Sequence, residues 1–274
     1  LESCELCPRL CKINRLNDEK GFCGIGAKVV VSSAGPHYGE EAVLVGSGGS
    51  GTIFFAGCNL SCVFCQNYDI SQLRNGYEVE IDDMANMMLQ LQTRGCVNIN
   101  FVTPTHVVPQ VIESVFLAKE RGLAIPVVYN CGGYESIESL LLLEGAIDIY
   151  MPDAKYLSCD SSRKYSFAQD YPDVMKSALL EMYRQVGDLE TKDGIAVRGL
   201  LVRHLVMPDN IAHSKEIIDF IANEISENTF VNIMDQYRPA FNAHDFAEIN
   251  RPVTRQEFNT IYEYAKNKGL RLVD

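Results

Sequence analysis

The sequence has no tryptophan, no long apolar run and a shortage of basic side chains. The missing tryptophan excludes nothing, but a chain without about 18 consecutive apolar residues offers no transmembrane helix. The 24 lysines and arginines face 36 aspartates and glutamates, which gives a net charge of −12 at pH 7. Such a charge argues against binding to nucleic acid or to an anionic membrane. Residues 1–25 also lack the apolar core of a signal peptide, so we expect a cytoplasmic protein.

The chain does have enough apolar material for a folded core. Its hydrophobic fraction is 47% and its charged fraction 22%, values that are ordinary for globular proteins and exclude intrinsic disorder. A length of 274 residues suits one large domain, because barrels of about this size commonly form a single one.

Cysteine is the informative part of the composition, because most of the ten thiols fall into two short groups. The groups are Cys4, Cys7, Cys11 and Cys23, followed by Cys58, Cys62 and Cys65. Disulfide scaffolds of secreted proteins are usually short and cysteine-dense throughout, whereas this chain has a long apolar body. We therefore predict that the grouped thiols bind metal in a reducing compartment. The others, Cys96, Cys131 and Cys159, are expected to be small buried apolar residues.

Short apolar runs alternate with amphipathic stretches from residue 52 onward. The runs are 52–56, 97–102, 125–129, 146–150, 200–206 and 230–234, and the stretches are 82–94, 107–121, 136–144, 173–187, a segment after Ser214 and one from Pro252 to Gly269. Continuous apolar runs suit buried parallel strands, and a 3.6-residue period suits helices. The alternation predicts an α/β fold with an open, six-unit partial β/α barrel. An open doubly wound sheet is the alternative that periodicity does not exclude.

The composition divides the chain into three expected parts. Residues 1–36 form a cysteine-rich metal-binding module, residues 37–51 a glycine-rich connecting loop, and residues 52–274 the barrel. Within the loop, His37 and the two glutamates that follow at positions 40 and 41 are candidates to cover a pocket in the barrel.

The second cysteine group directly follows the first expected strand. Cys58, Cys62 and Cys65 lie four and three residues apart, so one loop can turn all three sulfurs inward. A 4Fe–4S cluster usually takes four thiolates, and with three it keeps one iron open to a ligand from solution. The alternative is a zinc site that takes a fourth ligand from elsewhere in the chain.

This motif, with the aromatic Phe64 before its last cysteine, resembles the signature of the radical S-adenosylmethionine (radical SAM) superfamily. The resemblance implies a partial or full barrel, a 4Fe–4S cluster and S-adenosylmethionine (SAM) as cofactors, with Phe64 beside them. It implies an oxidoreductase in which the reduced cluster cleaves SAM to a 5′-deoxyadenosyl radical, which abstracts hydrogen from a substrate. A low-potential donor such as flavodoxin or ferredoxin would reduce the cluster.

Several strings along the chain are similar to a branch that resembles pyruvate formate-lyase activating enzyme and carries an amino-terminal four-cysteine module. They are Cys7-Pro-Arg-Leu-Cys11, Gly21-Phe-Cys-Gly24, Gly57-Cys-Asn-Leu-Ser-Cys62, Val102-Thr-Pro-Thr-His106, Pro152-Asp-Ala-Lys-Tyr156, Leu201-Val-Arg-His204 and Met234-Asp-Gln-Tyr-Arg-Pro239. This resemblance implies hydrogen abstraction from a protein or peptide, as in the activation of glycyl-radical enzymes.

The same resemblance indicates polar contacts to SAM at the ends of the strands. Thr103 and Thr105 replace the acidic segment with which relatives hold the methionyl amine, and Asn130 corresponds to a ribose contact. Active sites of parallel barrels lie at the carboxyl ends of the strands, where such side chains would meet. Asn130 could equally be a turn residue.

Two further strand ends carry charged residues. Asp153 and Lys155 resemble an Asp-x-Lys segment of activating enzymes, with Asp153 assigned to the cofactor and Lys155 to catalysis. Arg203 corresponds to an arginine near the cofactor carboxylate, and His204 is a second catalytic candidate. Adjacent residues of a strand face opposite sides, so one of Arg203 and His204 is expected to point away from the site. A structural ion pair is the alternative for Asp153 and Lys155.

The amino-terminal group offers four thiols within twenty residues, with Gly21 and Gly24 flanking Cys23. Four thiolates make a closed site that suits a second 4Fe–4S cluster or zinc. So short a segment needs metal to hold its fold.

Three functions remain open on the sequence. The first is a radical enzyme acting on a protein or peptide, and the second is one acting on a small molecule or cofactor precursor. The third is a non-catalytic electron-transfer protein, which would gain nothing from an open iron.

Overall fold

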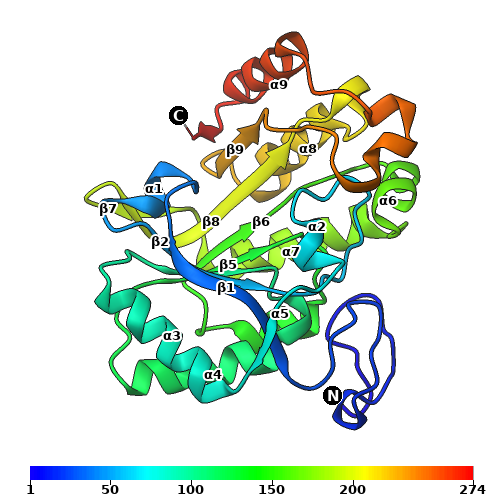
Figure 1. Cartoon of the computed structure of the whole chain (residues 1–274). Coiled ribbons are helices and arrows are strands. Elements are labelled where there is room, and N and C mark those ends of the chain that lie inside the picture. The colour runs from blue at the N-terminus through cyan, green and yellow to red at the C-terminus, as the bar shows by residue number, and fades with distance from the viewer. Residues whose placement is uncertain (274) are drawn as a thin grey trace.

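The computed structural model describes residues 1–273 and has one open sheet at its centre, with helices packed on it (Figure 1). The strands are β1 (Val29–His37), β2 (Ser50–Phe55), β3 (Tyr77–Val79), β4 (Ile99–Val102), β5 (Val127–Cys131), β6 (Ile149–Pro152), β7 (Glu190–Lys192), β8 (Ile195–Leu205), β9 (Phe230–Met234) and β10 (Arg271–Leu272). The α-helices are α1 (Ala42–Val45), α2 (Tyr68–Ser71), α3 (Ile81–Thr93), α4 (Val108–Glu120), α5 (Ile137–Leu143), α6 (Cys159–Ser166), α7 (Tyr171–Val186), α8 (Ser214–Phe220) and α9 (Arg255–Asn267).

The expected six-stranded run is confirmed. Strands β2, β4, β5, β6, β8 and β9 are neighbours in that order and pair in parallel. The order never reverses, whereas a doubly wound sheet needs a reversal at its switch point. The edge strands β3 and β10 do not pair with each other, so the sheet stays open as in a partial barrel. All six carboxyl ends therefore lie at one edge of the curved sheet.

Most of the expected helices form with small shifts at their ends. The helix expected over 173–187 begins earlier, at Tyr171, and the last helix begins at Arg255 instead of Pro252. The capping box of Thr254 and Glu257 is present, because each side chain accepts from the other's backbone N–H. Helices α3 and α4 bury their apolar faces, including Met84 and Val111, in the main core. None of the helices within residues 1–273 is long and apolar enough to cross a membrane.

Three local features differ from expectation. Strand β1 was not predicted; it pairs with β2 in antiparallel fashion, so the sheet begins at Val29, within the stretch assigned to the amino-terminal module. The division of the chain at residue 36 stays a prediction. Cys159 is exposed at the start of the unpredicted helix α6, whereas Cys96 and Cys131 are buried as expected.

The amino-terminal segment packs on the barrel beside α5 (Figure 1). Arg15 is almost completely buried and donates to the carbonyl oxygens of Gly26 and His106. Arg9 donates through Nε to the carbonyl oxygen of Asn59, at 2.8 Å, and the carbonyl oxygen of Leu6 accepts from two serines of the α5 region. Hydrogen bonds to a charged donor are worth about 1.5–3 kcal/mol each, so these arginines fasten the segment to the barrel.

Candidate active site

The three cysteines of the second group lie in the loop that joins β2 to α2. Gly57 begins this loop with φ of +83°, and a Cβ there would lie 2.8 Å from the carbonyl oxygen of Cys23. Only glycine permits both the left-handed conformation and this close approach. The loop can therefore turn at once from the end of β2 and present its thiols.

Each of the three thiols has a polar neighbour. Cys58 Sγ accepts from the backbone N–H of Leu60 at 3.3 Å. Cys62 Sγ lies 3.0 Å from the hydroxyl of Ser166, and Cys65 Sγ lies 3.2 Å from the hydroxyl of Ser71. Burial raises the pKa of both Cys58 and Cys62, so the metal-free thiols are protonated.

A cavity of about 360 Å³ brings this loop together with the carboxyl ends of the strands. Its lining includes all three thiols and most of the side chains predicted to contact the cofactor. Those side chains are Phe64, Thr103, Asn130, Asp153 and Arg203, and Lys155, the predicted catalytic residue, lines the cavity as well. Thr103 has φ of +61°, which is rare for a β-branched residue and is the kind of strain that clusters at functional sites.

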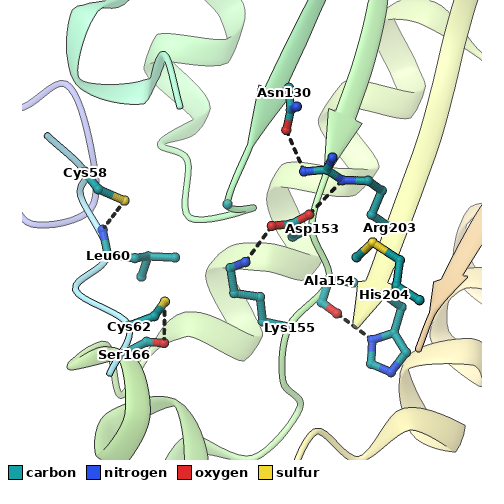
Figure 2. A network of polar contacts seen from close by, with 12 residues as sticks. Cys58, Leu60, Cys62, Asn130, Asp153, Ala154, Lys155, Ser166, Arg203 and His204 are labelled. Carbon is teal, nitrogen blue, oxygen red and sulfur yellow. Dashed lines mark hydrogen bonds and ion pairs between the residues drawn. The ribbon is translucent and has the colours of Figure 1, made fainter. Parts of the chain in front are cut away.

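A continuous polar network runs along this cavity (Figure 2). Arg203 donates through Nε to Asp153 Oδ1 at 3.0 Å and through Nη2 to Asn130 Oδ1 at 2.7 Å. Lys155 donates through Nζ to the other oxygen of Asp153 at 2.5 Å. Asn130 lies on β5, Asp153 directly follows β6, and Arg203 lies on β8, so three neighbouring strands contribute. Figure 2 shows Lys155 between Asp153 and the cysteine loop.

The charges in this network hold one another ionised. Burial alone would raise the pKa of Asp153, but Arg203 and Lys155 outweigh it and lower that pKa. Burial alone would lower the pKa of Lys155, but Asp153 and the nearby Cys62 outweigh it and raise that pKa. The side chains of Lys155 and Asp153 are 18% and 19% exposed, so a ligand in the cavity can still reach them.

The segment that connects β1 to α1 forms another wall of the cavity. His37 and Glu40 both line it, as predicted for this loop, and their side chains face each other with 3.3 Å between His37 Nδ1 and Glu40 Oε1. Glu40 Oε2 also lies 3.7 Å from Arg203 Nη1. Burial raises the pKa of Glu40 despite the opposing effect of Arg203. This segment therefore supplies a carboxylate to the network from outside the parallel strands.

Two of the predicted site residues lie away from the cavity. Thr105 is fully buried and donates to Glu135 Oε1 at 2.7 Å, because the chain turns into a short 3₁₀ helix directly after Thr103. His204 faces the other side of β8 from Arg203 and contacts the Ala154 carbonyl oxygen (Figure 2). Its other ring nitrogen lies 2.8 Å from the Ser214 hydroxyl. Burial lowers the pKa of His204 to about 4, so it is neutral at pH 7. These contacts give His204 a structural role in place of the predicted catalytic one.

Glu135 is a buried acid that sequence reasoning missed. It accepts from the hydroxyls of Thr105 and Tyr129, at 2.7 and 3.0 Å. Burial raises its pKa to about 7, against the lowering effect of these hydrogen bonds. Its position in the loop after β5, at a strand's carboxyl end, was the only signal that could have identified it.

The amino-terminal cysteines also lie around one cavity. Cys4, Cys7, Cys11 and Cys23 all line one small enclosed cavity, with His106 of the barrel on its wall. Gly21 approaches this group so closely that a Cβ there would lie 2.8 Å from Cys11 Sγ. Burial raises the pKa of Cys7 to about 12 and lowers that of His106 to about 4. Arg9 and Arg15 line the cavity as well, and both donate to backbone carbonyl oxygens.

The donor sets suit clusters better than single ions. Four sulfurs around one zinc at about 2.3 Å would lie within about 4 Å of each other. Within residues 1–273, no three His, Cys, Asp or Glu side chains are placed to hold one metal ion in this way. A cubane spreads its thiolates over separate irons, so cysteines that line a cavity without converging on one point fit it.

Comparison with known proteins agrees with this geometry. Residues 52–221 match the Radical SAM superfamily. An uncharacterized protein of Methanocaldococcus jannaschii is 34% identical, across 99% of this chain and 77% of that protein. A second protein of that organism, also described as uncharacterized, is 26% identical across 82% of this chain and 68% of its own length.

Solved structures share the fold at low identity. Methylornithine synthase (PylB) superposes with a TM-score of 0.53 at 13% identity, across 81% of this chain and 70% of that one. SuiB of Streptococcus suis bound to its precursor peptide SuiA gives 0.53 at 11% identity, across 78% of this chain. The chain spans only 46% of SuiB. The family match, the cysteine loop and the open parallel sheet together lead to one conclusion: this chain belongs to the radical SAM superfamily, whose members use a 4Fe–4S cluster and SAM.

Proposed function

We propose that this protein abstracts a hydrogen atom from a protein or peptide, in the manner of the enzymes that activate glycyl-radical proteins. The observation that carries the proposal is the single cavity shared by three thiols, two cations and the polar strand ends. The strings similar to activating enzymes, which run from Cys7 to Pro239, support the choice of branch.

The residues of the cavity divide between the two cofactors. Cys58, Cys62 and Cys65 would hold the cluster through three irons. Lys155 and Arg203 would bind the carboxylate of SAM, because both are cationic and partly accessible. When bound, the cluster and SAM together supply the radical that takes hydrogen from the substrate.

The remaining residues position these groups and exclude water. Asp153 holds both cations in place through its two oxygens, and Asn130 fixes the second guanidinium nitrogen of Arg203. Asn130 and Thr103 would contact the ribose and the methionyl amine. Phe64 is 6% exposed and contacts the ring of Tyr237 edge-on, so it shields the cluster side of the cavity from solvent.

A small molecule is the second candidate for the substrate. Lys155 and Arg203 both line the cavity, and two cations suit a carboxylate or phosphate as well as they suit SAM. A neighbouring cavity of about 690 Å³, lined by the segment before α1 and by residues 232–236, favours a peptide instead, because it gives an extended segment room beside the cofactor cavity.

We also propose that the amino-terminal cysteines bind one metal centre that delivers electrons or supports the fold. A second 4Fe–4S cluster fits better than zinc, because the four thiols line a cavity without converging on one ion. The carbonyl oxygen of Cys23 approaches Gly57, the residue before Cys58, so the chain that leaves one site contacts the chain that enters the other. A donor such as flavodoxin or ferredoxin would then pass electrons through this contact.

The proposal is tested by anaerobic reconstitution with iron, sulfide and SAM. Reduction should produce 5′-deoxyadenosine, and a deuterium-labelled protein partner should transfer its label into that product. No 5′-deoxyadenosine from a fully reconstituted and reduced protein would contradict the proposed activity. Label transfer from small metabolites but from no protein fraction would favour the second candidate.

A further inference from the structure

A second cavity, of about 690 Å³, adjoins the cofactor cavity. The residues that line both cavities, and so form the partition between them, are Gly39, Glu40, Arg203, Met234 and Gln236. The rest of the second cavity comes from the segment before α1, from β9 and the residues after it, and from α9. A substrate held there would lie next to the cofactors without occupying their place.

Among the charged side chains that line this second cavity, acidic ones outnumber basic ones. Glu40, Glu41 and the exposed Asp235 line it, and Arg203 is its one cation within residues 1–273. Arg203 is already shared between Asp153 and Glu40. The cavity therefore has a surplus of carboxylates and no free cation to balance them.

One of the two carboxylate oxygens of Glu41 lacks a hydrogen-bond partner within residues 1–273. The residue is 7% exposed, and its Oε1 accepts from Asn232 Nδ2 at 2.8 Å. Its other oxygen, Oε2, is buried and has no hydrogen-bond partner among residues 1–273. Burying a carboxylate oxygen without a hydrogen-bond partner destabilises the fold by about 1–3 kcal/mol, and by more when the group is charged. A ligand that donates a hydrogen bond to this atom would remove that cost.

The cofactors do not remove this surplus. The buried group comprises the carboxylates of Glu40, Glu41 and Asp153 against the cations of Lys155 and Arg203; the side chain of His37 is 44% exposed and lies outside this group. SAM has one net positive charge, and an oxidised cubane with three thiolates has one net negative charge, so together they are neutral. One carboxylate still needs a positive charge from another source.

We propose that the second cavity binds a protonated amine or guanidinium of the substrate, which donates to Glu41 Oε2. This inference rests on the proposed function, whose substrate it narrows to one with a cationic group. Phe258 and Tyr262 of α9 also line the cavity and would cover the apolar stem of a lysine or arginine side chain. The exposed ring of Tyr38 stands where a cation can lie over its face.

The test is equilibrium binding to the reconstituted protein with SAM and an oxidised cluster, without reductant. The probes are acetyl-Gly-Lys-Gly-amide, its uncharged analogue with norleucine in place of lysine, and 1,5-diaminopentane. We expect the lysine tripeptide to bind at least tenfold more tightly than the norleucine tripeptide. Equal binding of these two by the unmodified protein would overturn the proposal.

Matched variants assign the preference to Glu41. Glu41→Gln keeps an acceptor for Asn232 and removes the charge, so the preference for lysine should fall below threefold. Glu216→Gln removes a charge from an exposed position on α8 and should leave the preference unchanged. A tenfold preference that persists in Glu41→Gln would show that another group binds the cation and would overturn the assignment.

The diamine identifies the source of the cation. Binding of 1,5-diaminopentane as tight as that of the lysine tripeptide would support a small amine as substrate, and weaker binding would support a peptide. None of these measurements needs turnover. A failure to form 5′-deoxyadenosine would therefore contradict the proposed function. It would not affect the binding result, which tests the preference for a cationic substrate independently.

Discussion

The two cysteine groups differ in one thiol, and that difference separates their chemistry. The amino-terminal group has four thiols around an enclosed cavity, whereas the barrel group has three beside a cavity of about 360 Å³. Four thiolates complete the coordination of a metal centre, but three leave one iron for a ligand from solution. The open position lies where strand ends supply cations and polar side chains. Coordination and location therefore both assign cofactor chemistry to the barrel group.

The side chains that surround the two cysteine groups also differ. Lys155, Asp153 and Arg203 give the barrel cavity fixed charges that can orient a zwitterionic ligand. The amino-terminal cavity is backed by His106, which is neutral at pH 7. Arg9 and Arg15 line it too, but they donate to backbone carbonyl oxygens, and the cavity is small. Such a site suits a centre that stores or passes electrons or stabilises a fold.

The largest expected effect is the loss of cofactor cleavage when a barrel thiol is removed. Cys62→Ala leaves only two cluster ligands, so reductive formation of 5′-deoxyadenosine should fall below detection. Liquid chromatography of anaerobic reactions measures this product. Cys159→Ala, at an exposed thiol outside both groups, should behave like the unmodified protein. Product from Cys62→Ala would mean that the barrel group is not the catalytic one.

The matching change in the amino-terminal group should leave the chemistry in place. Replacing Cys4 and Cys7 together with alanine removes two ligands, and the segment should lose its metal-dependent order. We expect Tm to fall by about 5–10 °C, equivalent to about 2–3 kcal/mol for a chain of this size. A pre-reduced barrel cluster should still cleave SAM in a single turnover. If a fully reduced barrel cluster in this variant cannot cleave SAM, the two groups are not separable.

Acid should destabilise the fold through His204, a buried neutral histidine that packs behind the barrel cavity. Burial lowers the pKa of His204 from 6.5 to about 4, so the unfolded chain takes up this proton first as the pH falls. The stability that depends on neutral His204 is complete above pH 6.5 and is lost between pH 6.5 and 4, to a total of about 3 kcal/mol. Urea denaturation at several pH values should show this slope weakened in His204→Asn. His213→Asn, at a half-exposed histidine, should retain it.

The smallest expected effect concerns the polar rim of the barrel cavity. Asn130→Ala removes the acceptor for Arg203 Nη2 and a contact to SAM, at a cost of about 1.5–3 kcal/mol. The dissociation constant of SAM should rise about tenfold or more, as measured by calorimetry on the reconstituted protein. Asn228→Ala, on an exposed turn, is the control. An unchanged dissociation constant of SAM in Asn130→Ala would show that Asn130 is only a turn residue.

Sequence patterns predicted the strands and helices better than they predicted which side chains meet in the site. The six apolar runs became six parallel strands in chain order, because strands buried on both faces must be apolar almost throughout. Strand β1 was not predicted because it is only partly buried and its apolar residues alternate weakly. The exposure of Cys159 was not predicted either, because the pattern around a single cysteine does not indicate whether it is buried.

Position along a strand could not by itself sort the polar candidates. Thr103 and Thr105 are two residues apart and would share a face of a strand, but the chain turns between them and only Thr103 reaches the cavity. Arg203 and His204 are adjacent, and the strand sends one to the cavity and the other into the core. The sequence predicted that these two would separate and did not tell which of them would face the site.

The cysteine spacing by itself determined the family chemistry, because a three-thiol loop after a strand specifies both the ligands and the open position. Only the tertiary structure decided which distant side chains share the cavity. Asn130, Asp153 and Arg203 lie on separate strands, and Glu41 comes from a segment that precedes all of them. Their hydrogen bonds and unpaired atoms depend on angstrom-scale packing across the sheet, which no local pattern records. The surplus of buried carboxylate at Glu40 and Glu41, and the cationic substrate proposed from it, follow from that packing alone.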